Sequence, residues 1–496
     1  MADGSRGVGN PVFISVAAAT LFAAFSASIF YLPALPQVIV LLSVLVTLYF
    51  FTQPEVSLLV FFALRMIFDL LWWIPGEVFG LNMLELFSGA VAGLAAVLFV
   101  LEFRRFDDHP GVALFVPYLA VMAIAAGRNL EVRSAVEILA RYVSPFLIMF
   151  LVTFYFGNRR KRRRLFMTVS LVGIIPVVLS LFHLASGQME AYELAGYQRL
   201  QGAYKNLHNH ALMMMLVSTI GLFWLLQSRS VLMRVLFAGV TIAATIALYY
   251  TFVRTALLGL AGFVVAYLFF ARHYRKAFLV VVIGVTAVFY DDSLRERFSD
   301  VFVFFSDDGA YIHKDKLGSG RWGLWKYSFQ AYAQYPLGDM VLGLGLGKQW
   351  LLTQQYYDEY AAARFGYVDP HNDYLTLLYQ LGPIAVICYI GQQYLVLRYA
   401  YAIIKRRFDS FSYYYAAFCA GLCVTAMLTN FLSNAFVSRT TLGWYFWGFV
   451  GLLYGEWRSI QAHDREAAQA KPVPLFSPEG PTKPPDPEQP VLSEGR

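Results

Sequence analysis

Charged residues are scarce in this sequence. They make up 14% of the 496 residues, whereas an average soluble domain contains about 25%. Hydrophobic residues reach 58%, against about 45–50% in soluble domains. This shift excludes an ordinary soluble domain and indicates an integral membrane protein.

Cysteine is also rare. Cys388, Cys419 and Cys423 are the only ones, and all three lie inside apolar runs. That placement argues against a disulfide framework or a cysteine metal site, and it predicts small core residues of helices.

Long hydrophobic runs, by contrast, fill most of the chain. Each helix needs about 20 apolar residues to cross the hydrocarbon layer, so the runs predict an all-α polytopic membrane protein with about 12–14 transmembrane helices. The expected spans are Pro11–Tyr31, Pro36–Phe51, Ser57–Pro75, Leu81–Phe103, Val112–Ala126, Val136–Gly157, Leu165–Leu184, His210–Gln227, two spans that meet near Thr251–Thr255, Phe278–Tyr290, Tyr374–Tyr399, Tyr413–Asn430 and Leu442–Tyr454. In the third, Arg65 and Asp69 lie one helical turn apart, which favours a structural ion pair over a catalytic one.

The pattern divides the chain into four parts. These are a transmembrane bundle (1–290), one large loop with short helices (291–370), C-terminal transmembrane helices (371–460) and a disordered tail (461–496). The first apolar run has no convincing cleavage site, so we interpret it as a retained helix.

The formal net charge of +7 does not indicate nucleic-acid binding. The basic residues cluster in short runs between apolar segments, as the positive-inside rule produces. With both termini in the cytoplasm, six basic segments fall on the cytoplasmic side: Arg104-Arg105, Arg159–Arg164, Arg229 with Arg234, Arg272–Lys276, Lys405–Arg407 and the tail. The same topology places Arg199, Arg254 and the loop Asp291–Tyr374 on the outer face.

Three features of the sequence have competing interpretations. Arg254 lies between two apolar runs, where an unpaired guanidinium is costly; a bound phosphate or a salt bridge to a loop carboxylate would each supply the missing charge, and the sequence leaves both open. The repeat Gly343–Gly347 lacks the strand–helix context and the Lys-Ser/Thr of a nucleotide loop, so a turn between short helices is predicted. His208 and His210 are two residues apart on a helix, which argues against a shared metal.

Four motifs then follow in order. They are Ser319-Gly320-Arg321 with Leu324-Trp325, Pro336-Leu337-Gly338, the glycine repeat, and His371-Asn372-Asp373-Tyr374-Leu375 at the start of a span. This order resembles the O-antigen ligase and O-antigen/exopolysaccharide polymerase superfamily of bacterial envelopes. The resemblance is clear over about residues 199–382 and extends to the many-span layout.

The resemblance implies a GT-C-like membrane fold and a metal-independent inverting glycosyltransferase with no cofactor. It would act on the periplasmic side of the bacterial inner membrane, in contact with membrane lipid. The donor would be an undecaprenyl-diphosphate-linked glycan, and the acceptor a glycan or lipid A-core. We expect a polymerase, because about fourteen spans and a tail exceed the roughly twelve typical of ligases; an O-antigen ligase is the alternative. A lipid-linked glycan transporter is less favoured, because no internal repeat is visible.

The resemblance also implies roles for single residues. Arg321 and Arg254 would neutralise the leaving diphosphate in place of a metal, although Val253 stands where serine is common. His371 would take the proton of the acceptor hydroxyl, a task that suits a pKa near neutrality, and the alternative is a polar cap of the span. The expected substrate-binding residues are Arg199, Lys205, Asn209, Asn372 and Tyr374, of which Arg199 matches only loosely.

Overall fold

The computed structural model describes most of the helical part of the chain. The described residues are 49–70, 77–78, 81–106, 108–128, 132–188, 190–192, 197–200, 202, 204, 206–291, 295, 321–353 and 369–469, without the side chains of 77–78, 81–86, 132–140, 190–192 and 197–198. Almost all of the first two predicted spans, Lys205, much of the large loop and the tail beyond 469 lie outside them.

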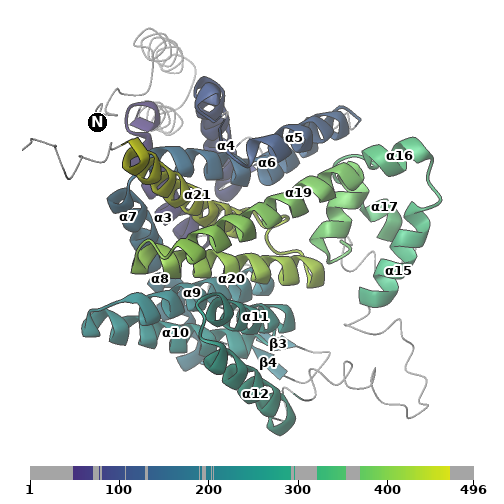
Figure 1. Cartoon of the computed structure of the whole chain (residues 1–496). Helices are drawn as coiled ribbons and strands as arrows, with labels where there is room; N and C mark the ends of the chain where they lie inside the picture. The colour runs from purple at the N-terminus through teal and green to yellow at the C-terminus, as the bar shows by residue number, and fades with distance from the viewer. Residues whose placement is uncertain are drawn as a thin grey trace, which may run out of the picture.

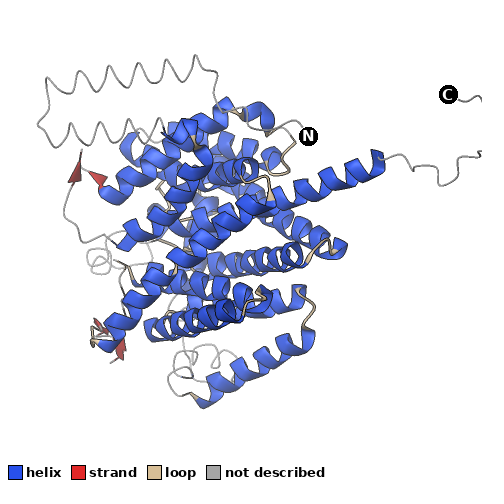
Figure 2. Cartoon of the chain, turned by 90° about the vertical axis from the view of Figure 1, so that its left-hand side faces the viewer, coloured by secondary structure: helices blue, strands red, loops and turns tan. Residues whose placement is uncertain are grey.

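Helices dominate the described residues (Figures 1 and 2). The first part of the chain forms α3 (Pro54–Leu70), α4 (Met83–Leu101), α5 (Val112–Gly127), α6 (Val132–Tyr155), α7 (Arg159–Val172), α8 (Ile174–Ala185), α9 (Leu207–Gln227), α10 (Val231–Thr251), α11 (Arg254–Phe270) and α12 (Tyr274–Tyr290). The rest forms α15 (Arg321–Tyr332), α16 (Leu337–Leu342), α17 (Trp350–Thr353), α19 (Asp373–Arg406), α20 (Ser410–Leu432) and α21 (Thr440–Gln469). Two small antiparallel hairpins join them, β1 (Glu77–Val78) with β2 (Leu81–Asn82) and β3 (Glu190–Tyr192) with β4 (Tyr197–Arg199).

Several helices have the length and composition of membrane spans. Five helical segments of the described residues are long and apolar enough: Arg159–Ala185, Leu207–Gln227, Val231–Thr251, Asp373–Arg406 and Ser410–Leu432. Shorter apolar helices, among them α5 and α11, accompany them. The protein is therefore an all-α polytopic membrane protein, as predicted, and the expected break between α10 and α11 is confirmed.

One predicted span contains a break, and one predicted boundary differs. The span expected over Leu165–Leu184 is present within Arg159–Ala185, with a break at Gly173 between α7 and α8, because Pro176 has no N–H to continue the helical bonding across the junction. The last helix, α21, continues to Gln469, past the tail boundary expected at residue 461. Its final turns contain good helix formers, and Asp464 pairs there with Arg406.

The core lies where the C-terminal helices meet the middle of the chain. α21 packs on α6, α19 and α11 pack on α20, and α9 packs on α10. α9 and α21 are buried over most of their length, whereas α12 exposes apolar side chains such as Phe278 and Phe289. The three cysteines are free and buried, so their prediction as core residues is confirmed.

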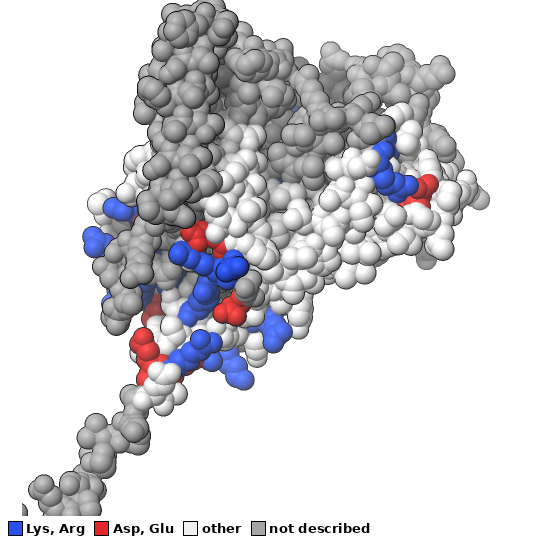
Figure 3. Space-filling model, turned by 90° about the horizontal axis from the view of Figure 1, so that it is seen from above, with Lys and Arg blue, Asp and Glu red and all other residues white. Residues whose placement is uncertain are grey.

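The two ends of the bundle differ in chemistry. Basic residues near one end pair with acidic ones there, as in Arg159 with Asp409 at 2.7 Å and the buried pair Arg162–Glu456 at 2.7 Å. Figure 3 shows most Lys, Arg, Asp and Glu of this view gathered on one side of the molecule. Figure 2 shows both hairpins at the end opposite the one from which the last helix projects. The motif residues belong to the hairpin end.

A kink in α19 positions this hairpin end. Gly382 has φ +78° within the helix, and the following Pro383 has no N–H to donate to the carbonyl of Tyr379. The backbone N–H of Leu344, in the glycine loop, donates to that carbonyl instead, at 2.7 Å. The loop therefore supplies a hydrogen bond that the proline removes.

Glycine is required where the loop and the kink touch. A Cβ on Gly343 would lie 2.3 Å from the Gln380 carbonyl oxygen, and one on Gly382 would lie 2.1 Å from that of Val341. Gly345 N–H donates to the Gln380 carbonyl at 3.1 Å. The glycine repeat is thus a turn between the short helices α16 and α17, as predicted, and it docks backbone against backbone.

Candidate active site

His371 lies in a tight turn just before α19. Its backbone is left-handed, with φ +51°, a conformation that histidine adopts more readily than most residues. The Asp369 carboxylate accepts hydrogen bonds from the His371 backbone N–H and from the Thr376 hydroxyl, the latter at 3.1 Å. Trp325 Nε1–H donates to the Pro370 carbonyl at 2.8 Å. The hydrogen bond to Asp369 and the one from Trp325 therefore fix the backbone at His371 and at the residue before it.

The helix cap at this point is Asn372. Its Oδ1 accepts from the backbone N–H groups of Tyr374 and Leu375 at 3.0 and 3.1 Å. The Tyr374 hydroxyl donates to Gln393 Oε1 at 3.0 Å, inside the bundle. The capping role considered for His371 thus belongs to Asn372, and the contacts seen for Asn372 and Tyr374 are scaffold contacts. Substrate binding by these two residues stays a prediction.

Arg321 faces the same turn from α15. It is the first residue of that helix, and its guanidinium donates to the Leu432 carbonyl at the end of α20. Partial desolvation of the His371 imidazole, together with the charges of Arg321 and Arg439, lowers the His371 pKa to about 4. The pKa is lower than the near-neutral one expected, because desolvation and arginines from other elements both act on the ring. The imidazole is consequently neutral at physiological pH.

Asp373 organises the loop between α20 and α21. This buried carboxylate sits one residue into the motif helix and accepts hydrogen bonds from a turn of that loop. The donors are the N–H groups of Ala435 at 2.8 Å, Val437 at 3.1 Å and Ser438 at 3.3 Å, and the Ser438 hydroxyl at 2.6 Å. Arg439 follows Ser438 directly in the chain, so these hydrogen bonds place it close to His371.

Arg439 is the functional candidate that sequence reasoning missed. Its Nε donates to the Asn434 carbonyl at 2.7 Å, and its guanidinium donates to Asn209 Oδ1. Desolvation lowers its pKa to about 10, against the opposing effect of the Asp373 and Asp369 carboxylates. One signal was available: the predicted topology places Arg439 on an outer-face loop, where the positive-inside rule depletes basic residues.

Other charged groups converge at the start of α9. Arg199, Arg321, His371 and Arg439 all lie close enough to His208 for their charges to act on it. The structure thus brings three predicted residues together, His371, Arg321 and Arg199, and Asn209 joins them through Arg439.

Arg254 lies at the same end of the bundle. It begins α11, directly after a corner at which Phe252 has φ +54°. Leu200 N–H donates to the Tyr250 carbonyl at 3.0 Å, so the strand that carries Arg199 is tied to this corner. The role of Arg254 stays a prediction.

The two histidines of α9 face different surroundings. His210 is fully buried; its Nε2 lies 3.4 Å from Ser180 Oγ, and a Cβ on Gly202 would lie 2.3 Å from its ring. His208 instead faces the arginine cluster. Their spacing on the helix predicts this divergence, which argues against a metal shared by the pair.

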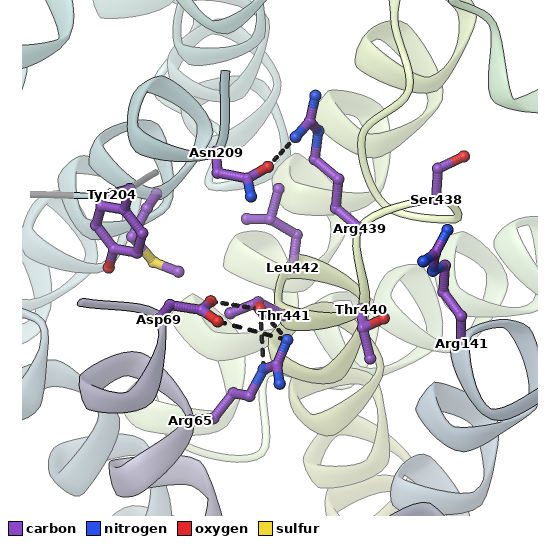
Figure 4. Close-up of a pocket in the computed structure, with 11 residues that line it drawn as sticks. Arg65, Asp69, Arg141, Tyr204, Asn209, Ser438, Arg439, Thr440, Thr441 and Leu442 are labelled. Carbon is purple, nitrogen blue, oxygen red and sulfur yellow. Dashed lines mark hydrogen bonds and ion pairs between the residues drawn. The ribbon is translucent and has the colours of Figure 1, made fainter. Parts of the chain in front are cut away.

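A cavity of about 230 Å³ adjoins the cluster (Figure 4). It shares Asn209 and Arg439 with the histidine site and extends to the ion pair of Arg65 and Asp69, whose closest N–O distance is 3.6 Å. Arg65 Nε also donates to the Thr441 hydroxyl at 2.9 Å. The structural ion pair expected within α3 is thus present and forms one wall of the cavity.

The arrangement has a defined chemical capacity. A neutral imidazole can accept a proton, and the forked donors of neighbouring guanidinium groups suit phosphate or carboxylate oxygens. The site can therefore hold an anion beside a group that removes a proton.

A comparison with protein families found one match. Residues 239–390 match the family model described as O-antigen ligase, which confirms the resemblance predicted from the ordered motifs. The matched segment contains Arg254, Arg321, the glycine repeat and His371, whereas Arg199, Asn209 and Arg439 lie outside it. A comparison with curated proteins found no match.

Proposed function

We propose that the protein is a polysaccharide polymerase, which transfers an undecaprenyl-diphosphate-linked glycan to the sugar of a growing chain. The observation that carries the proposal is the approach of His371 to Arg321, inside the segment that matches the O-antigen ligase family. The family match supports glycan transfer in general, and the choice of polymerase rests on the number of predicted spans.

The proposed step is an inverting displacement. The acceptor hydroxyl oxygen bonds to the anomeric carbon of the donor while the bond from that carbon to the diphosphate oxygen breaks. His371 accepts the hydroxyl proton, and the electron pair of the broken bond leaves on the diphosphate. Arg321 and Arg254 bind and neutralise that charge, which is the role that a metal ion has in other glycosyl transfers.

We place the site on the periplasmic side of the inner membrane, with both termini in the cytoplasm. The basic run Arg159–Arg164 and the Lys405–Arg407 segment belong to the end opposite the motif turn, since α19 runs from Asp373 to Arg406. Basic residues favour the cytoplasmic side. Labelling of single cysteines introduced at each end, in intact cells and in inverted vesicles, tests this orientation.

Reconstitution with a lipid-linked repeat unit tests the function. Chain growth in the absence of lipid A-core is the result expected of a polymerase. Transfer that occurs only when lipid A-core is added identifies the alternative, an O-antigen ligase. Movement of the intact lipid-linked glycan across the bilayer, without any transfer, contradicts both.

Transfer is expected to continue in excess EDTA, because arginines neutralise the leaving group. The measurement is the initial rate of chain growth in reconstituted vesicles with and without the chelator. A loss of activity that Mg²⁺ or Mn²⁺ restores contradicts the arginine mechanism.

The pH dependence is expected to follow the lowered His371 pKa. The neutral imidazole is the active form, so kcat/KM, which reports the free enzyme, stays level as pH falls below neutrality and declines only near a pH of about 4. A bound diphosphate offsets the charges of Arg321 and Arg439 and raises this pKa, so the decline in kcat lies at higher pH. A kcat/KM profile that falls near the ordinary histidine value of about 6.5 contradicts this geometry.

A further inference from the structure

The cavity beside the histidine site is built by parts of the chain that are far apart in sequence. Its lining comes from α3, α6, the start of α9 and the start of α21 (Figure 4). All the lining residues lie outside the segment 239–390 that matches the O-antigen ligase family. The family match therefore assigns no role to this cavity.

Positive charge dominates the cavity. Among the described residues, its charged lining consists of Arg65, Arg141 and Arg439 with the single carboxylate of Asp69. Three guanidinium groups and one carboxylate therefore face the cavity, with Arg65 paired to that carboxylate. A ligand that binds here is favoured if it carries negative charge.

The start of α21 adds a second source of positive potential. Ser438, Thr440 and Thr441 line the cavity where this 30-residue helix begins, and the first N–H groups of a helix attract anions. The Asp69 carboxylate accepts a hydrogen bond from the Thr441 hydroxyl at 2.5 Å. This hydrogen bond fixes Asp69 beside the first turn of α21.

The walls also present groups that suit sugar hydroxyls. The side-chain amide of Asn209 lines the cavity. Ser438 and Thr440 add hydroxyl groups. A volume of about 230 Å³ is below the roughly 300–1,000 Å³ of pockets for drug-sized ligands, and it suits one sugar unit.

We propose that this cavity is a specificity pocket for an acidic sugar, which binds the carboxylate of a hexuronate unit of the acceptor glycan through Arg141 and Arg439. The inference rests on the proposed glycan transfer and adds the substrate class. We assign the cavity to the acceptor because it adjoins His371, the residue proposed to accept the proton of the acceptor hydroxyl. Arg321, assigned to the donor diphosphate, lies within the family-matched segment, whereas the cavity lining lies outside it.

Binding to the full-length protein in nanodiscs tests the proposal with three probes: glucuronic acid, glucose and inorganic pyrophosphate. Wild type is expected to bind glucuronic acid about tenfold or more tightly than glucose, the difference that one charge-assisted hydrogen bond provides. Arg141→Gln should remove this preference, and Arg141→Lys should retain part of it. Pyrophosphate affinity should be unchanged in both variants.

Arg105→Gln is the matched control. Arg105 pairs with Glu102 at 2.8 Å and does not line the cavity, so its replacement removes one positive charge elsewhere. Its glucuronic acid affinity should equal that of wild type. The preference of wild type for glucuronic acid over glucose is measured without any variant. It therefore tests the proposal even if Arg141→Gln fails to fold.

Three outcomes overturn the inference: equal wild-type affinity for glucuronic acid and glucose, an unchanged preference in Arg141→Gln, or a matching loss of pyrophosphate affinity, which would assign the cavity to the donor.

Reconstituted transfer by the same preparation separates the two proposals. Transfer without a glucuronic acid preference refutes the acidic-sugar pocket alone. A preference in a protein that transfers no glycan supports the pocket and contradicts the proposed function.

Discussion

Replacement of His371 by alanine is expected to abolish measurable glycan transfer. Loss of a general base typically costs about 10²–10⁴-fold in rate, and the neutral imidazole of His371 is the base that we propose. Donor binding should be nearly normal, because the arginines remain. The measurements are chain growth in reconstituted vesicles and affinity for the lipid-linked donor, on the same purified protein.

The backbone of this turn provides a control. Because φ is +51° at His371, an alanine there is strained, whereas asparagine tolerates a left-handed backbone. His371→Asn should therefore have the same unfolding temperature as wild type and still be inactive. Activity near the wild-type level in either variant removes His371 from the mechanism.

Replacement of Arg321 or Arg254 by lysine is expected to slow transfer by about 10²–10³-fold, the usual cost of one aimed donor to a developing charge. Lysine keeps the charge but loses the fork that can bind two oxygens at once. At Arg321 the substitution is severe for a second reason: the guanidinium already donates to the Leu432 carbonyl, and a single ammonium replaces all of its directed N–H groups. Donor affinity should fall in both variants, in contrast to His371→Ala.

Arg105→Lys is the comparison for these variants. Arg105 is a half-exposed arginine in an ordinary ion pair with Glu102, and such pairs tolerate the change at a cost of about 1 kcal/mol or less. All three lysine variants should insert and fold normally, and Arg105→Lys should retain full activity. If Arg321→Lys and Arg254→Lys behave like Arg105→Lys, both arginines are scaffold, and the diphosphate is bound elsewhere, with Arg199 and Lys205 the next candidates.

Much of the fold was predictable because its signals are local. A run of apolar residues identifies a span wherever it occurs, and the polar break around Thr251–Thr255 marks the corner between α10 and α11. The glycine repeat lacks the neighbours of a nucleotide loop, so its interpretation as a turn needs only adjacent residues. The order of the motifs around Arg321 and His371 likewise lies within one stretch of chain.

The remainder of the site depends on contacts that no local pattern encodes. Asp373 meets Ser438 across 65 positions, and Arg65 meets Thr441 across 376. These pairings bring Arg439 to the histidine and create the cavity. The lowered His371 pKa likewise depends on the fold, since it comes first from desolvation and then from Arg321 and Arg439, which belong to other elements.

The kink in α19 has a consequence for biogenesis. In the proposed topology, the glycine loop is synthesised before α19 and must cross to the periplasm before that helix is complete. Until then the Tyr379 carbonyl has no donor, and an unsatisfied carbonyl in the bilayer costs several kcal/mol. Contact with Leu344 N–H ends that penalty, so α19 takes its final shape only after translocation of the loop. Because Asp373 begins this helix and holds the turn before Arg439, the active site is assembled among the last steps of membrane insertion.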